Sequence, residues 1–184
     1  MAAFLSSLND SLIQFIKAQQ MFFVATAAED GRINLSPKGL DSLRVEDKQH
    51  ILWVNYTGSG NETAAHLLSQ NRMTMMFCSF LGTPLILRLY GKAKVYHEGD
   101  SEWDDLLADF DHKSGARNIF RLQIESVQTS CGYAVPEYEF SGQRSILVDR
   151  AKEKGPNYFK SYWKENNSKS IDGLPTGIKV DQSD

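Results

Sequence analysis

The sequence has little cysteine and no long apolar run. Only Cys78 and Cys131 occur in 184 residues, which is too few for a disulfide scaffold and is typical of a reducing compartment. No stretch approaches the roughly 20 consecutive apolar residues that a membrane-spanning helix needs. The first twenty residues also lack the basic leader, apolar core and cleavage site of a secretory signal. We therefore expect a soluble cytoplasmic protein that does not associate with membranes.

An excess of positive charge is also missing. The formal net charge is −3, so the chain offers nucleic acid no broad electrostatic attraction. The four histidines and two cysteines show no metal-ligand spacing, and no histidine stands where it would activate Cys131 as a nucleophile. We expect no nucleic-acid partner, no metal site and an inert Cys131.

The length and composition indicate one ordinary globular domain over residues 1–184. Apolar residues make up 41% of the chain and charged residues 23%, close to the average for soluble proteins. Residues 7–19 place Leu8, Leu12, Phe15 and Ile16 on one face, which predicts an amphipathic helix.

Six β-strands are predicted, in the ranges 21–28, 33–36, 50–56, 73–80, 85–97 and 116–129. Asp30-Gly31 is a tight-turn signal between the first two strands, and Gly91 lies mid-strand, where a bulge is expected. Six strands in meander order favour a mainly β fold, a β-barrel with flanking helices. A long strand that bends at a glycine suits the closure of a small barrel.

Helical signals surround the last strand. Residues 101–110 predict a short acidic helix with Ser101 as its cap, and residues 143–166 predict helix interrupted at Gly155-Pro156. Residues 168–184 read as a polar tail. We expect the region from about 143 to 184 to be a helical C-terminal extension of the domain.

The most informative local feature is a glycine loop, Thr57-Gly58-Ser59-Gly60-Asn61-Glu62-Thr63, between a strand and a helix. Such a loop can offer backbone N–H groups and a helix N-terminus to a phosphate. It also fits a plain turn with Asn61 as an ordinary helix cap. It matches neither the triphosphate-binding loop nor the dinucleotide-binding fingerprint.

A second segment, Asn34-Leu35-Ser36-Pro37-Lys38-Gly39, ends a predicted strand. Pro37 has no N–H to give a neighbouring strand, which predicts an edge strand or an open seam that can receive a ligand. Lys38 is either a cation at that ligand or a solvated surface lysine. Arg88, in the apolar strand LILRLYG, needs a partner if it faces inward and none if it faces outward.

Several motifs together resemble the FMN-binding split-barrel superfamily of pyridoxamine 5'-phosphate oxidase, and most closely its oxidase-related branch. They are FVATA, DGRINLSPKG, TGSGNETAAHL, RMTMMFCSF, LRLYG, VQTSCGY and SIDGLPTG, and they extend from about Phe22 to Gly177. The resemblance implies a six-stranded split barrel that binds FMN as a homodimer, with sites across the interface. The arginine-rich C-terminal motifs of the true oxidases are absent, so the vitamin B6 substrate is not expected here.

The resemblance also implies the cofactor-binding residues. Ser36, Pro37, Lys38 and Gly39 would line the flavin, Trp53, Val54 and Asn55 would lie along it, Ser59, Gly60, Asn61 and Thr63 would surround its phosphate, and Arg88 matches an arginine of the oxidases. No catalytic acid or base is assigned, because the flavin itself supplies the reactivity. The expected function is an FMN-dependent oxidoreductase with a small-molecule electron donor and acceptor. The alternatives are a flavin- or haem-binding sensor without turnover, and a deazaflavin-dependent reductase.

Overall fold

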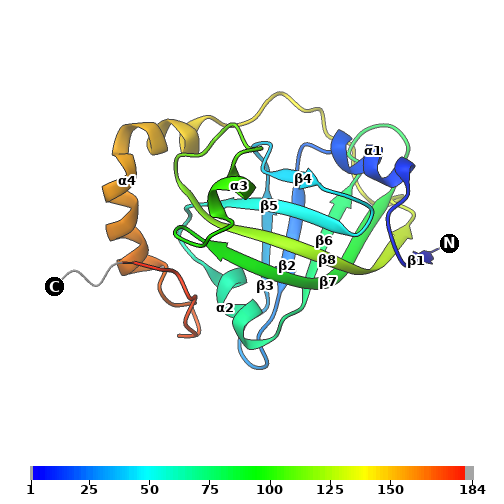
Figure 1. Cartoon of the computed structure of the whole chain (residues 1–184). Helices are drawn as coiled ribbons and strands as arrows, with labels where there is room; N and C mark the ends of the chain where they lie inside the picture. Colours follow the sequence, from blue (N-terminus) through cyan, green and yellow to red (C-terminus); the bar gives the residue numbers. More distant parts are fainter. Residues whose placement is uncertain (1, 181–184) are drawn as a thin grey trace.

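The computed structural model describes residues 2–180, which form one antiparallel β-sheet closed by helices (Figure 1). All six expected strands are present, as β2 (Phe22–Thr26), β3 (Asn34–Lys38), β5 (His50–Tyr56), β6 (Met73–Cys78), β7 (Ile86–His97) and β8 (Ala116–Ser130). Two three-residue strands, β1 (Ala3–Leu5) and β4 (Leu43–Val45), bring the number to eight instead of the six expected. Strands this short carry too little alternation to be recognised from sequence.

The sheet follows the order β3-β2-β6-β7-β8-β5-β4, with β1 paired to the far end of β8. The predicted meander order is wrong, because β5 pairs with β8 and β6 pairs with β2, pairings that a local pattern does not encode. The two long strands β7 and β8 run through both halves, and their register shifts between Tyr90 and Gly91. A Cβ on Gly91 would lie 1.9 Å from the carbonyl oxygen of Gln123, so only glycine permits this bulge. The predicted bulge is confirmed, and it bends the sheet toward a half-barrel.

The barrel interior is apolar, and two helices pack against it. Helix α1 (Asp10–Ala18) contributes Leu12 and Ile16 to the core, and α2 (Glu62–Ser69) contributes Ala64 and Leu67. Inward-facing residues of every long strand join them in one cluster. Burial of these side chains stabilises the fold by about 25 cal/mol per Å² of apolar surface.

The two cap predictions need correction. The short helix α3 is Trp103–Leu107 and begins after Glu102, while the hydroxyl of Ser101 donates to the Glu102 carboxylate instead of capping the helix. Asn61 does stand directly before α2, but its side chain makes no capping bond. Both predictions followed residue preference, but Ser101 bonds its neighbour Glu102 and the Asn61 amide bonds the carbonyl of Asn167.

The C-terminal extension is α4 (Ile146–Asn166) followed by an irregular segment. Gly155, at φ 73°, interrupts α4 at the predicted position. Residues 168–180 are not the free polar tail that the sequence suggested, because Ser170 and Thr176 are buried. Residues 181–184 of that predicted tail lie outside the described residues. Within residues 2–180, no helix combines the length and apolar character needed to cross a membrane.

Candidate ligand-binding cavity

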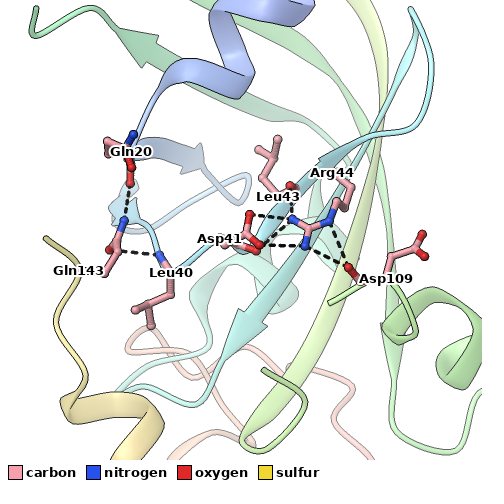
Figure 2. Close-up of polar contacts among 7 residues, drawn as sticks. All are labelled: Gln20, Leu40, Asp41, Leu43, Arg44, Asp109 and Gln143. Atoms are coloured by element: carbon pink, nitrogen blue, oxygen red, sulfur yellow. Dashed lines mark hydrogen bonds and ion pairs between the residues drawn. The ribbon is translucent and has the colours of Figure 1, made fainter. Parts of the chain in front are cut away.

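The open seam of the barrel lies where the edge strand β3 turns into β4. Leu40 and Asp41 adopt positive φ angles of 62° and 53°, which non-glycine residues rarely do. Arg44 holds this corner: its guanidinium bonds both carboxylate oxygens of Asp41 at 2.9 Å and the carbonyl oxygen of Asp109 at 3.0 Å (Figure 2). A strained corner held so firmly is typical of a binding site.

A cavity of about 1020 Å³ opens beside this corner. Its floor consists of the end of β3, the corner itself and the second half of β5. A second wall comes from residues 138–150, which comprise the end of the connection after β8 and the first turn of α4 (Figure 1). The strand order confirms the edge position expected from Pro37, since β3 is an edge strand of the sheet.

Lys38 places a partly buried positive charge in the cavity. Its ammonium lies 5.1 Å from the centre of the Trp53 ring and 3.4 Å from the side-chain oxygen of Asn55. Burial, with a smaller contribution from the charge of Arg117, lowers the pKa of Lys38 to about 8. Among residues 2–180 no carboxylate pairs with it. A partly buried cation whose hydrogen-bond and ring partners are neutral favours an anionic or electron-rich ligand.

The glycine loop is held by residues that the sequence analysis missed. The fully buried Asn167 donates to the carbonyl of Gly58 and accepts a bond of 2.6 Å from Arg117. Arg117 also donates to the Gly58 carbonyl, and Trp163 donates to the hydroxyl of Thr57. Burial lowers the pKa of Arg117 to about 10, so its charge persists at neutral pH. No local motif marks Asn167, because its partners are about 50 and 109 residues away.

The start of α2 is bonded to the C-terminal segment and to β3. The Asn61 amide donates to the carbonyl of Asn167, and its side-chain oxygen is buried without a described partner. The hydroxyl of Thr63 accepts a bond from Asn34 at 3.2 Å. Asn34 shares the inward face of β3 with Ser36 and Lys38, so this face links the start of α2 to the cavity.

The structure brings only part of the predicted site together. Six predicted residues line the cavity, namely Pro37, Lys38, Gly39, Trp53, Val54 and Asn55. Ser36, Ser59, Gly60, Asn61, Thr63 and Arg88 are not part of its lining. Arg88 faces away from the core, between buried Leu87 and Leu89, and donates to the hydroxyl of Ser130. It therefore takes the outward orientation of the two that the sequence allowed.

The described residues offer no evident metal chemistry. Within residues 2–180 no group of three or more histidine, cysteine, aspartate or glutamate side chains is arranged to hold a metal ion. No histidine contributes to the cavity lining described above. The chemical character of the site is thus cationic and apolar, with amide and aromatic groups on its floor.

Comparison with known proteins shows what the chain resembles. A family model described as pyridoxamine 5'-phosphate oxidase matches residues 8–131. A curated relative from Aspergillus flavus, the pyridoxamine 5'-phosphate oxidase family protein ustO, is 37% identical over 95% of this chain and 78% of its own length.

Two solved structures share the fold at low identity. One is a protein from Lactobacillus delbrueckii, described as a candidate pyridoxamine 5'-phosphate oxidase, with a TM-score of 0.53 and 20% identity over 67% of this chain and 94% of its own. The other is HutZ, a haem storage protein from Vibrio cholerae, with a TM-score of 0.50 and 16% identity over 68% of this chain and 97% of its own.

Proposed function

This chain belongs to the pyridoxamine 5'-phosphate oxidase family, and from that premise we propose that it is an FMN-binding oxidoreductase whose flavin ring occupies the seam cavity. The observation that carries the proposal is the partly buried, unpaired ammonium of Lys38 beside Trp53 and Asn55. A flavin ring carries electron-rich oxygens and nitrogens that such a cation would attract. The low identity to solved structures supports the fold alone.

The residues on the cavity floor fit a flavin ring. Pro37 adds little bulk to the floor, the side chain of Gln143 covers Gly39 beside it, and the Asn55 amide can bond a ring heteroatom. Ser42 and Trp53 both belong to the lining, and each has a buried polar atom without a described partner. When bound, FMN supplies hydride acceptance at its ring nitrogen N5 and passes the electrons to oxygen, a quinone or another acceptor.

The chain's own residues orient the ring, exclude water and set the charge around it. Lys38 stabilises negative charge on whatever lies above the floor, and its pKa near 8 keeps it protonated at pH 7. The electron donor and acceptor are small molecules that approach through the open side of the cavity. None of these roles needs a protein acid or base.

The phosphate of FMN is assigned to the glycine loop and the inward face of β3. Asn34, Ser36 and Lys38 alternate along that face over roughly 13 Å, from the start of α2 to the cavity. A ligand lying along it would reach Ser59, Gly60, Asn61 and Thr63, with Thr57 and Gly58 at the cavity border. The backbone N–H groups at the start of α2 would then hold the phosphate.

Affinities for FMN and riboflavin test this assignment, since riboflavin lacks the phosphate. Each bond to the phosphate contributes roughly 1.5 to 3 kcal/mol, or about ten- to a hundredfold in affinity. Ser59→Ala and Thr63→Ala should each weaken FMN by that factor and leave riboflavin nearly unchanged. If both variants keep the preference for FMN while Lys38→Ala or Arg88→Ala abolishes it, the loop assignment is wrong.

We also propose a homodimer that uses the outer face of the sheet. On this face, directly paired residues of five neighbouring strands form one row, which consists of Pro37, Phe23, Met76, Arg88 and Gln128. Phe4 on β1 extends this row, and exposed Leu35 lies next to it on β3. A second copy on this face would lie next to the cavity, because Pro37 belongs to both. Arg88 would then act at the interface.

Two observations on purified protein decide between an enzyme and the alternatives. We expect a yellow protein whose released chromophore has the fluorescence of FMN, and we expect NADH or NADPH to bleach it without oxygen and air to restore the colour. A bound flavin that no reductant bleaches indicates a binding or sensing protein. Preferential binding of a deazaflavin indicates the reductase alternative, and a haem spectrum contradicts the flavin assignment.

A further inference from the structure

The cavity wall formed by residues 138–150 lies outside the part of the chain that matches the family model. That match ends at residue 131, whereas the wall consists of residues 138–150. Its apolar side chains remain partly open: Tyr138 is 63% exposed, Phe140 48% and Leu147 37%. Apolar side chains gathered at a cavity rather than scattered over the surface indicate a binding surface.

The wall is fastened to the barrel rather than lying loosely beside it. The side chain of Gln143 donates to the carbonyl of Gln20 at 3.0 Å and accepts from the N–H of Leu40 at 3.3 Å, as Figure 2 shows. At the other end, the N–H of Tyr138 donates to the carbonyl of Phe80, and their rings lie 5.7 Å apart. The wall is therefore preorganised, which lowers the entropic cost of binding.

The cavity has room for more than the cofactor. Single ligands typically occupy pockets of roughly 300 to 1,000 Å³. At about 1020 Å³ this cavity lies at the upper end of that range. With a flavin on the floor, the space along residues 138–150 is left for a second molecule.

The charges on the wall select the kind of molecule. Arg144 and Arg150 belong to the lining, and Glu139 is its one acidic residue. Neither arginine has a carboxylate partner within residues 2–180, and Arg150 bonds only the hydroxyl of Tyr158, at 2.7 Å. Two guanidinium groups without carboxylates next to aromatic side chains match an anion attached to an apolar body.

We propose that residues 138–150 form a substrate wall that takes an organic anion with an aromatic or otherwise apolar body. Arg144 and Arg150 bind the anionic group, and Tyr138, Phe140 and Leu147 contact the apolar body. The inference depends on the proposed function only in assigning the floor to the flavin and the wall to its substrate. Substrate choice then resides in a segment that the family model does not include.

A pair of probes that share one ring system tests the wall. Naphthalene-2-sulfonate is an anion, and naphthalene-2-methanol is neutral; both are titrated calorimetrically into the full chain, with and without FMN. We expect one sulfonate per chain, bound at least tenfold more tightly than the alcohol in both forms. Arg144→Gln and Arg150→Gln should each reduce this preference about three- to tenfold, and Phe140→Ser should weaken both probes equally.

Arg72→Gln is the matched control, because Arg72 is exposed, unpaired with any described carboxylate and absent from the cavity lining. It should leave the preference unchanged. Equal affinity for the two probes, an equal effect of Arg72→Gln, or displacement of the sulfonate by one equivalent of FMN would overturn the proposal. Sulfonate binding that weakens as protein concentration rises would instead assign the wall to a second copy of the chain.

The two proposals can fail separately. If FMN does not bind but the sulfonate preference still depends on Arg144 and Arg150, the cofactor assignment fails and the wall stands. If FMN binds and is reduced but the probes do not distinguish charge, the wall fails and the cofactor assignment stands.

Discussion

Lys38 shows at the level of one residue how a binding site opposes stability. Its charge is partly buried among neutral groups, which is expensive unless a ligand supplies the missing partner. Substitution of such a residue by an apolar one commonly stabilises the fold and weakens ligand binding. The stability of the ligand-free protein should therefore report on Lys38 directly.

We predict that Lys38→Met stabilises the ligand-free protein at pH 7. The pKa of Lys38 falls from 10.5 in the unfolded chain to about 8 in the folded one, so its burial costs up to about 3 kcal/mol below pH 8. Between pH 8 and 10.5 the folded protein has released a proton that the unfolded chain still binds, so the wild type gains stability as pH rises. Urea unfolding should show the advantage of the variant at pH 7 and a smaller one at pH 10.

The control for this prediction is Lys160→Met, which removes an exposed lysine of α4. Its effect on stability should be small and independent of pH. A Lys38→Met advantage that stays constant from pH 7 to pH 10 would mean that the gain comes from apolar packing rather than from removal of a buried charge.

At the scale of elements, the C-terminal extension holds the glycine loop. Asn167 joins Gly58 to Arg117 and, through its carbonyl, accepts bonds from Asn61 and Thr176. The segment after α4 thus positions the strand-to-helix turn at the end of the cavity. Without this segment, the carbonyl of Gly58 and the guanidinium of Arg117 would each lose a hydrogen-bond partner.

We predict that Asn167→Ala lowers the free energy of unfolding by about 2 to 4 kcal/mol, because it leaves the buried Arg117 charge without its 2.6 Å partner. The neighbouring Asn166→Ala is the control, since exposed Asn166 bonds only the carbonyl of Tyr162, and its effect should stay within about 0.5 kcal/mol. If Asn167 also positions the loop, its variant loses the preference for FMN over riboflavin under conditions where it is folded. An unchanged preference would limit Asn167 to a structural role.

The bulge between β7 and β8 is the second element-scale test. Gly91→Ala places a Cβ 1.9 Å from the Gln123 carbonyl oxygen, and neither backbone can yield without breaking the paired register. We predict a loss of at least about 3 kcal/mol in chemical denaturation. Gly58→Ala has nothing within 4 Å of its Cβ and should cost less than about 1 kcal/mol. Equal effects of the two substitutions would argue against the close approach at Gly91.

At the scale of the whole molecule, the outer sheet face is the surface proposed for the dimer. We predict that Leu35→Glu converts a dimer to a folded monomer, because Leu35 is 64% exposed in the single chain and becomes desolvated only at an interface. Leu68→Glu is the matched control, since Leu68 is similarly exposed, at 56%, but lies on α2 away from that face. Sedimentation at several concentrations measures both. A Leu68→Glu variant that dissociates while Leu35→Glu does not would place the interface elsewhere.

The sequence by itself determined most elements of the fold, because their signals are local. Alternation and glycine placement identified the six longer strands, the Gly91 bulge, the break at Gly155 and the edge position of Pro37. These features depend on neighbouring residues and on backbone sterics, which a linear pattern records. The two short strands β1 and β4 were missed, since three residues leave almost no period to detect.

Only the tertiary structure decided how the site is assembled. It turned Arg88 outward, placed Lys38 with Trp53 and Asn55 in one cavity, and joined Asn167 to Gly58 and Arg117. It also laid residues 138–150 over the seam as a second wall. These contacts join residues far apart in the chain, and their geometry follows from the strand register and from the path of the connection after β8, neither of which a local pattern encodes.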